Sequence, residues 1–255
     1  SWTLTALPLF VWMGEILFRT KLSENLFKGL SPWMQKLPGG LIHVNIVGCA
    51  LFAAISGSSA ATVATVGKMS IPELRKRNYP EKILLGSLAG SGTLGLLIPP
   101  SIILIIYGVA VQESIAKLFI AGIIPGIMIA IIFMSYVIIW SLINKKEMPK
   151  TLEEYSFLEK VKRSTQLLPV ILLILGVIGS IYTGVATATE AASLGVVGAL
   201  ILSYFQKSLT LETFKSSLLG ATKTSCMIAF ILAGSTFLSL AMGFTGLPRN
   251  LAIWI

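Results

Sequence analysis

The sequence is poor in the side chains on which most enzymes and metal sites depend. Among 255 residues there are one histidine and two cysteines, and 12% of the residues are charged. A lone histidine cannot complete a zinc site. Cys49 and Cys226 have no CxxC spacing, so we interpret both as packing residues. Nucleophile-elbow and P-loop patterns are also missing. We therefore predict that the chain is not an enzyme and carries no organic cofactor.

Apolar sequence dominates the remainder. The chain is 55% hydrophobic, with a mean hydropathy of +0.85. These values exclude a soluble globular domain and a disordered chain. The long apolar runs do not alternate every second residue, as β-barrel strands would, so we predict an all-α polytopic membrane protein. The net charge of +9 could suggest nucleic-acid binding. Because the basic residues lie between apolar runs, we expect cytoplasmic loops and a lipid bilayer as the partner, with no nucleic acid.

The apolar runs predict helices in a definite order. We expect spans over 4–18, 118–143, 167–182, 191–205 and 224–244, with an amphipathic segment over 210–219. Ser31-Pro32 has the residue types of a helix start and predicts a short interfacial helix over 31–37. Basic residues over 75–82 and 144–166 mark the cytoplasmic side. No signal peptide is visible, the segment 1–18 resembles a span already under way, and the sequence stops at Trp254-Ile255 without a tail, so we expect a piece of a longer polypeptide.

The stretch 55–67, ISGSSAATVATVG, interrupts an apolar region. The approach over 41–55 is about 15 residues, or roughly 22 Å of helix, against about 30 Å for a hydrocarbon core. It ends in Ser56, Gly57, Ser58 and Ser59, a second half follows, and basic residues flank both ends. We predict a re-entrant helical hairpin over 40–70 with its tip inside the membrane. Irregular backbone at that depth is tolerated only against protein or a wet cavity, so the tip is a candidate site.

A second interruption follows at Gly95-Leu-Leu-Ile-Pro99-Pro100-Ser101, between the apolar halves 83–97 and 102–111. Paired prolines remove hydrogen-bond donors and leave carbonyl groups free. Two discontinuous segments are typical of the binding site of a secondary transporter. The alternative is that small residues only permit tight helix packing, which we expect of the GxxxG pairs Gly86/Gly90 and Gly122/Gly126. The GxGxxG match over 90–95 is not a nucleotide site, because no strand precedes it.

The polar groups of both interruptions are uncharged. Proton-driven carriers usually place a carboxylate or a histidine at depth, whereas neutral hydroxyls and carbonyls suit Na⁺, so we predict Na⁺ as the coupling ion. Other polar motifs are interpreted as structural. Thr187 with Glu190, and Thr151 with Glu154, predict helix capping boxes. Glu15 is expected to pair with Arg19 one turn later.

Four segments carry a close resemblance to a known family: ISGSSAATVATVGKMSIPEL, LLIPPSIILIIYGV, SIAKLFIAGIIPG and TGVATATEAASLGVVGAL. In this order they resemble the large membrane subunit of TRAP transporters, the tripartite ATP-independent periplasmic carriers of bacteria and archaea. The resemblance covers essentially the whole chain. The family often has proline between the threonines of TPTE, where this chain has Ala188, so no functional role is carried over to Thr187 or Thr189.

The resemblance implies Na⁺-coupled import of carboxylate-bearing solutes, such as sialic acid or C4-dicarboxylates, across the bacterial inner membrane. It implies two partners, a periplasmic substrate-binding protein and a small four-helix membrane subunit. The fold would be an elevator-type, inverted-repeat carrier. It would comprise a scaffold span with the interfacial helix (1–39), a transport-domain hairpin with a broken helix (40–112), a spanning helix (113–143), a cytoplasmic linker (144–166), and spans leading into an incomplete second repeat (167–255).

The resemblance also gives the expected site residues. Expected Na⁺ ligands are Ser56, Gly57, Ser58, Ser59, Gly92, Thr93, Gly95, Ile98 and Pro99. Expected solute-binding residues are Ser56, Gly57, Ser58, Ser59, Ala60, Pro100 and Ser101. Two alternatives stay open, namely a stand-alone Na⁺/anion symporter of the same superfamily and, from a different class, a channel-like membrane scaffold.

Overall fold

The computed structural model describes residues 2–149, 155–246 and 253, and within them all regular structure is helical. The elements are η1 (Trp2–Thr5), α1 (Ala6–Phe18), α2 (Leu22–Met34), α3 (Ile42–Ser56), α4 (Ser59–Lys76), α5 (Glu81–Gly92), η2 (Thr93–Leu96), α6 (Ile102–Val111), α7 (Ile115–Ile143), α8 (Phe157–Ser164), α9 (Leu168–Tyr182), α10 (Ala188–Phe205) and α11 (Leu211–Thr245).

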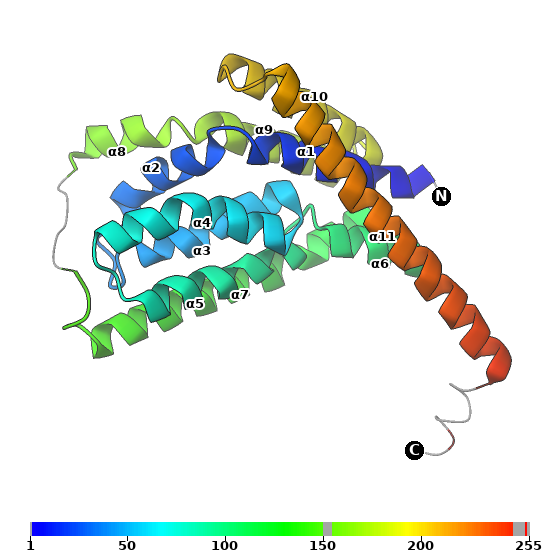
Figure 1. Cartoon of the computed structure of the whole chain (residues 1–255), viewed down its shortest axis with the longest axis horizontal. Coiled ribbons are helices and arrows are strands. Elements are labelled where there is room, and N and C mark those ends of the chain that lie inside the picture. Colours follow the sequence, from blue (N-terminus) through cyan, green and yellow to red (C-terminus); the bar gives the residue numbers. More distant parts are fainter. Residues whose placement is uncertain (1, 150–154, 247–252, 254–255) are drawn as a thin grey trace.

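The core lies around α3, which is the most enclosed helix of the bundle (Figure 1). The helix packs against α4 and α5 on one side and against α1 and α7 on others. Its side chains Ile42, Ile46 and Phe52 are fully buried. A helix that is apolar on nearly all faces, as α3 is, is buried either among other helices or in lipid, and here its neighbours bury it. The two helices α3 and α4 are joined by two residues and form the helical hairpin that the sequence predicts.

Within the described residues, three helices are long and apolar enough to cross a membrane: α7, α10 and α11. A fourth is possible if α8 and α9, which are bent by 55° relative to each other, form one span. The outward face of α7 exposes a row of isoleucines, including Ile124 at 77% exposure, and an exposed apolar row of this kind is typical of a helix that faces lipid. All-helical structure with several apolar helices agrees with the predicted polytopic membrane protein.

The predicted start of a helix at Ser31 is wrong. Helix α2 begins at Leu22 and passes through Pro32 near its C-terminal end. The Ser31 hydroxyl does not cap a helix start but donates to Phe27 O, 2.6 Å away and one turn back. Pro32 has no N–H and so removes one backbone hydrogen bond from the C-terminal part of the helix. The segment over 31–37 is therefore the end of a helix and the turn after it.

The predicted division between 210–219 and 224–244 is also wrong, because α11 is one helix of 35 residues. Its length is about 52 Å at 1.5 Å per residue. The residues between the two predicted segments include Gly220 but no proline, and the Thr222 hydroxyl donates to Leu218 O at 2.8 Å. A hydroxyl that bonds back to its own helix leaves the backbone ladder intact.

Several smaller expectations can be compared directly with the structure. The capping box of Thr187 and Glu190 is confirmed at the start of α10. Helix α8 has a capping box from Ser156 and Glu159 that the sequence analysis missed. The pair expected from Thr151 and Glu154 lies outside the described residues. The Glu15–Arg19 ion pair is confirmed.

The two cysteines differ. Cys49 is buried as expected, but Cys226 is exposed on α11, so its interpretation as a packing residue is wrong.

Candidate binding site at the hairpin tip

The hairpin tip is a two-residue reversal between α3 and α4. Helix α3 is followed by its C-cap residue Gly57, which has the left-handed φ of +57° and donates its N–H to Ala53 O at 3.1 Å. Glycine is favoured here because residues with a Cβ atom have a steric energy penalty in the left-handed backbone region. Ser58 follows in an extended conformation and is the N-cap of α4, where its Oγ accepts from Ala61 N at 3.4 Å. The sequence Ser-Gly-Ser-Ser therefore ends one helix and starts the next.

The three serines of the tip differ in how their hydroxyls are used. Ser56 Oγ lies 2.9 Å from Thr62 Oγ1, and Thr62 Oγ1 donates to Ser58 O at 2.8 Å. Ser56 and Ser58 thus hold the tip together from within. Ser59 Oγ is buried and makes no hydrogen bond to any described residue. A buried oxygen without a partner is costly, so Ser59 is the tip hydroxyl best suited to a ligand.

The broken helix supplies a second group of oxygens. Helix α5 tightens into η2, Ile98 N donates to Leu94 O at 2.9 Å, and the Ser101 hydroxyl donates to Leu96 O at 2.7 Å. The chain then crosses a cis Pro99–Pro100 bond and starts α6 at Ile102. Among the described residues no hydrogen bond uses the carbonyl oxygens of residues 97–100. These are the free carbonyls that the paired prolines predict.

The tip and the break are in direct contact through backbone. A methyl group built on Gly57 would lie 2.8 Å from Pro100 O. A methyl group built on Gly95 would lie 3.0 Å from Ser59 N. Side chains at these two positions would push the two interrupted helices apart. The structure therefore brings together the two segments that the sequence analysis singled out separately.

Two neighbouring helices support this contact, also through glycines. On α1, a methyl group on Gly14 would lie 2.9 Å from Ser56 Cα. On α7, one on Gly122 would lie 2.6 Å from Leu97 O, and one on Gly126 would lie 2.9 Å from Ile98 Cγ1. The predicted packing role of Gly122 and Gly126 is confirmed, and their partner is the break itself.

The other GxxxG pair, on α5, behaves differently. A methyl group on Gly86 would meet nothing within 4 Å, and one on Gly90 would lie 3.6 Å from the Phe133 ring. Gly90 thus makes an ordinary contact with α7, and the packing role that we predicted for Gly86 is wrong. GxxxG spacing alone does not tell which glycines lie at a close helix contact.

A cavity of about 380 Å³ opens beside the tip. Gly57, Ser58 and Ser59 form its polar end. Its other walls are apolar and are formed by the following residues of η2, α6 and α11: Leu96, Ile102, Ile103, Ile106, Ile228, Ile231 and Leu232. A mostly apolar cavity with a few convergent polar groups is the usual form of a small-molecule site.

The expected site residues fall into three groups by burial. Ser56, Gly57, Gly92, Gly95, Pro99, Pro100 and Ser101 are buried, while Ser58, Ser59 and Ile98 are half-buried at the contact. Ala60 and Thr93 are exposed, and the Thr93 hydroxyl donates to Gly90 O. The sequence analysis missed Gly14 and Thr62. A glycine in an apolar helix and a threonine four residues after an N-cap serine are weak signals that could have pointed to them.

This fold and this site define a class, a helical membrane protein in which two interrupted helices meet beside a small cavity. The family model described as "Tripartite ATP-independent periplasmic transporter, DctM component" matches residues 1–255. The chain is 32% identical over its full length to the C4-dicarboxylate TRAP transporter large permease protein DctM of Pseudomonas aeruginosa, and it spans 59% of that protein. The chain belongs to the DctM family of tripartite ATP-independent periplasmic transporters.

Other relatives show the range of proteins to which the chain is similar. It is 34% identical to the sialic acid TRAP transporter large permease protein SiaM of Vibrio cholerae, covering 99% of this chain and 58% of that protein. It is 32% identical to the isethionate TRAP transporter permease protein DctMQ of Oleidesulfovibrio alaskensis, covering 99% of this chain and 40% of that protein. The chain thus spans about three fifths of the length of the first two relatives named.

Proposed function

We propose that the chain is part of the large permease subunit of a Na⁺-coupled importer of carboxylate-bearing solutes in a bacterial inner membrane. Family membership supports a transport function without covalent chemistry. Relatives named for C4-dicarboxylates and sialic acid support the solute class. The partners are a periplasmic binding protein and a small membrane subunit, which agrees with the term "tripartite" in the family description. The hairpin is re-entrant, and it moves with the broken helix in an elevator-type displacement.

The observation that carries the Na⁺ proposal is the unpartnered Ser59 hydroxyl beside the break. Its Oγ is buried without a hydrogen bond, and the carbonyl oxygens of residues 97–100 are equally unused. Together they offer neutral oxygens near the C-terminal end of α3 and the C-terminal end of the segment formed by α5 and η2. Helix C-terminal ends carry partial negative charge. Hard cations take oxygen ligands of this type. No aspartate or glutamate is buried among the described residues, so the attraction for Na⁺ comes from oriented dipoles.

The solute proposal rests on a helix N-terminal end, that of α4. Helix α4 begins at Ser59, which lines the tip cavity, and the positive end of the helix dipole attracts an anion. A carboxylate there would lie beside the Na⁺ oxygens of the break. Each charge would stabilise the other in the low dielectric of the interior. This mutual stabilisation is a direct physical basis for coupled binding of ion and solute.

The test is uptake by proteoliposomes that contain the complete permease, its small subunit and its binding protein, with imposed Na⁺ gradients. Replacing Na⁺ by choline should abolish uptake. Ser59→Ala should raise the Na⁺ concentration for half-maximal uptake roughly tenfold, because losing one oxygen ligand costs about 1–2 kcal/mol. The matched control is Ser56→Ala, whose hydroxyl bonds within the hairpin, and it should lower thermal stability more than Na⁺ affinity.

Different results would point to other functions. Uptake that needs Na⁺ but not the binding protein would identify a stand-alone symporter. Non-saturable flux without Na⁺ would identify a channel-like scaffold. An unchanged Na⁺ dependence in Ser59→Ala would remove the tip from the cation site.

A further inference from the structure

A second cavity, of about 500 Å³, lies away from the hairpin tip. It opens between the end of α1, the turn into α2, the middle of α4 and the first turns of α11. In contrast to the tip cavity it is lined by charged side chains: Arg19, Lys21, Lys68, Glu24 and Glu212. Its apolar wall comes from Phe18 and Met69. We call this cavity the basic cleft.

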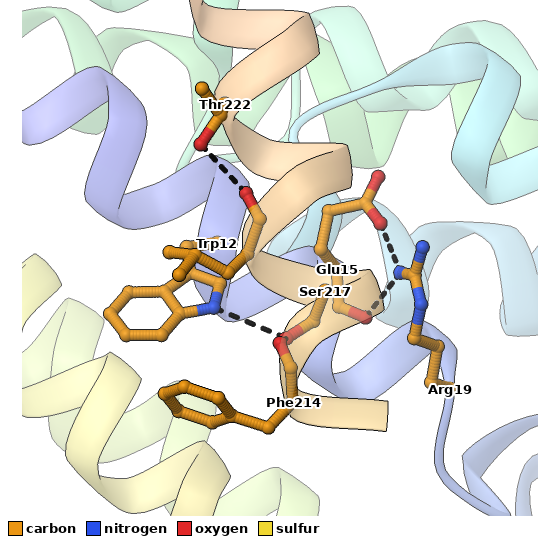
Figure 2. Close-up of polar contacts among 7 residues, drawn as sticks. Trp12, Glu15, Arg19, Phe214, Ser217 and Thr222 are labelled. Carbon is orange, nitrogen blue, oxygen red and sulfur yellow. Dashed lines mark hydrogen bonds and ion pairs between the residues drawn. The ribbon is translucent and has the colours of Figure 1, made fainter. Parts of the chain in front are cut away.

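Beside the basic cleft, α1 and α11 are held together by a well-defined contact (Figure 2). Trp12 Nε1 donates to Ser217 Oγ at 3.2 Å, and the Trp12 ring meets the Phe214 ring edge-on, with centroids 5.8 Å apart. One turn later, Gly220 faces the Glu15–Arg19 ion pair. A methyl group on Gly220 would lie 2.5 Å from Glu15 Oε2. The absence of a side chain there lets α11 pack directly over the ion pair.

The charges of the basic cleft are unequally engaged. Arg19 uses Nη1 for both of its contacts with Glu15, to the carboxylate and to the backbone oxygen, which leaves Nε and Nη2 for another acceptor. Glu24 is paired with Lys28, outside the basic cleft. Lys21 and Lys68 are exposed, and neither forms an ion pair with a described residue. Glu212 is the one acid of the cleft that has no such partner among the described residues, so an excess of positive charge remains.

The position of the basic cleft favours one kind of anion. It lies where the apolar helix α1 ends and where α11, long enough to span a membrane, begins. The ends of spanning helices lie at the level of lipid headgroups, and basic pockets between such helices bind headgroups. Guanidinium and ammonium groups together suit phosphate, the first through its fork of donors and the second as a point charge.

We infer that the basic cleft binds a phosphate group through Arg19, Lys21 and Lys68. The bound group bridges α4 of the hairpin to the turn between α1 and α2, because Lys68 comes from α4 and Arg19 and Lys21 come from that turn. Glu212 opposes binding and limits its strength. The inference does not depend on the Na⁺ or solute proposal, since none of these residues touches the tip cavity.

Thermal unfolding of the purified complete permease in a neutral detergent tests this inference. One series of samples receives soluble short-chain phosphatidylglycerol, a second a phosphate-free glycolipid, and a third inorganic phosphate. The variants are the double substitution Lys21→Gln/Lys68→Gln, the charge-opposite Glu212→Gln, and the control Lys82→Gln. Lys82 is also exposed, but it lies at the start of α5, away from the basic cleft.

Phosphatidylglycerol should stabilise the permease, and the glycolipid should not. Each basic residue near a membrane surface contributes about fivefold in affinity, so the double substitution should weaken binding roughly 30-fold. Glu212→Gln should tighten binding about fivefold by the same reasoning, and Lys82→Gln should leave it unchanged. Stabilisation by inorganic phosphate with the same dependence on the variants would identify a free phosphate ligand. Stabilisation by the lipid alone would identify a headgroup. Equal affinities in all variants, or equal effects of both lipids, would overturn the inference.

Discussion

The hairpin tip and the basic cleft both lie between the hairpin and α1 or its C-terminal end, but the chemistry of the two regions differs. At the tip, Gly14 of α1 brings backbone against the backbone of Ser56, and the polar groups are uncharged. At the basic cleft, α1 contributes Arg19 and α4 contributes Lys68, and the side chains are long and charged. Backbone contacts through glycine fix a geometry within a fraction of an ångström, whereas long charged side chains adapt to what they bind. The tip is therefore the rigid contact and the basic cleft the adaptable one.

The largest effect should follow from Gly57→Ala, which tests the rigidity of the tip. The substitution meets two penalties, a left-handed backbone and a clash with Pro100 O, which together cost about 3 kcal/mol. The thermal unfolding midpoint and the rate of Na⁺-driven uptake should both fall. The matched control is Gly184→Ala, which has a φ of +72° but no atom within 4 Å and so meets only the backbone penalty. Equal losses in both variants would contradict a close contact at the tip.

A smaller effect is expected of Gly14→Ala, which separates α1 from the tip. The added methyl group would lie 2.9 Å from Ser56 Cα, and relieving such overpacking costs about 1–3 kcal/mol. Gly243→Ala is the control, because it follows a methionine in the same way and has open space around it. In the control, alanine should be neutral or stabilise the helix by up to about 1 kcal/mol. Unfolding midpoints of the four single-alanine variants, measured side by side, would rank the two contacts.

On the side of the basic cleft, Trp12→Phe should cost about 1 kcal/mol, the net contribution of one hydrogen bond. The substitution removes the bond to Ser217 and keeps an aromatic ring against Phe214. Because α11 then loses a fixed point beside the cleft, phosphate binding should weaken while Na⁺ affinity stays unchanged. A loss of Na⁺ affinity of the same size would show that the two regions are not independent.

The smallest effect concerns an ion pair in full contact with solvent. The guanidinium of Arg75, hydrogen-bonded to Glu81, lowers the pKa of that carboxyl below its ordinary value. A lowered pKa contributes stability above the unfolded-state pKa of about 4.3, and this stability is lost as the pH falls through the folded-state value. Arg75→Gln should therefore reduce the difference between unfolding midpoints measured at neutral pH and near pH 3. An unchanged difference would show that the pair does not contribute.

The tip and the break could be predicted from the sequence because both are encoded locally. Gly57 permits a left-handed turn, Ser58 caps the helix after it, and Pro99-Pro100 cannot continue a helix, so each interruption is visible within a few residues. Their contact could not be derived from spacing, since it depends on Gly57 meeting Pro100 across more than forty positions of sequence. The resemblance to a family supplied that expectation.

Other predictions were wrong, and other features were missed, because they too depend on contacts between segments that are distant in sequence. Ser31-Pro32 resembles a helix start, yet burial of the preceding turn extends α2 through it. Nothing local marks the basic cleft, because Arg19, Lys68 and Glu212 come from three distant segments that only packing brings together. Gly86 and Gly122 have the same GxxxG spacing, and only the positions of their neighbours distinguish the open glycine from the buried one.

The two glycines of α7 have a consequence for motion. Gly122 admits the Leu97 carbonyl and Gly126 admits Ile98, so the break rests on α7 without an intervening side chain. If α7 slid by one helical turn, about 5.4 Å, in the direction that brings its preceding turn to the break, the ring of Phe119 would meet the carbonyl that Gly122 now accommodates. Close packing therefore opposes a shift of α7 in that direction. A displacement of the tip that keeps these contacts would therefore have to include α7, whose 29 residues carry the exposed row of isoleucines.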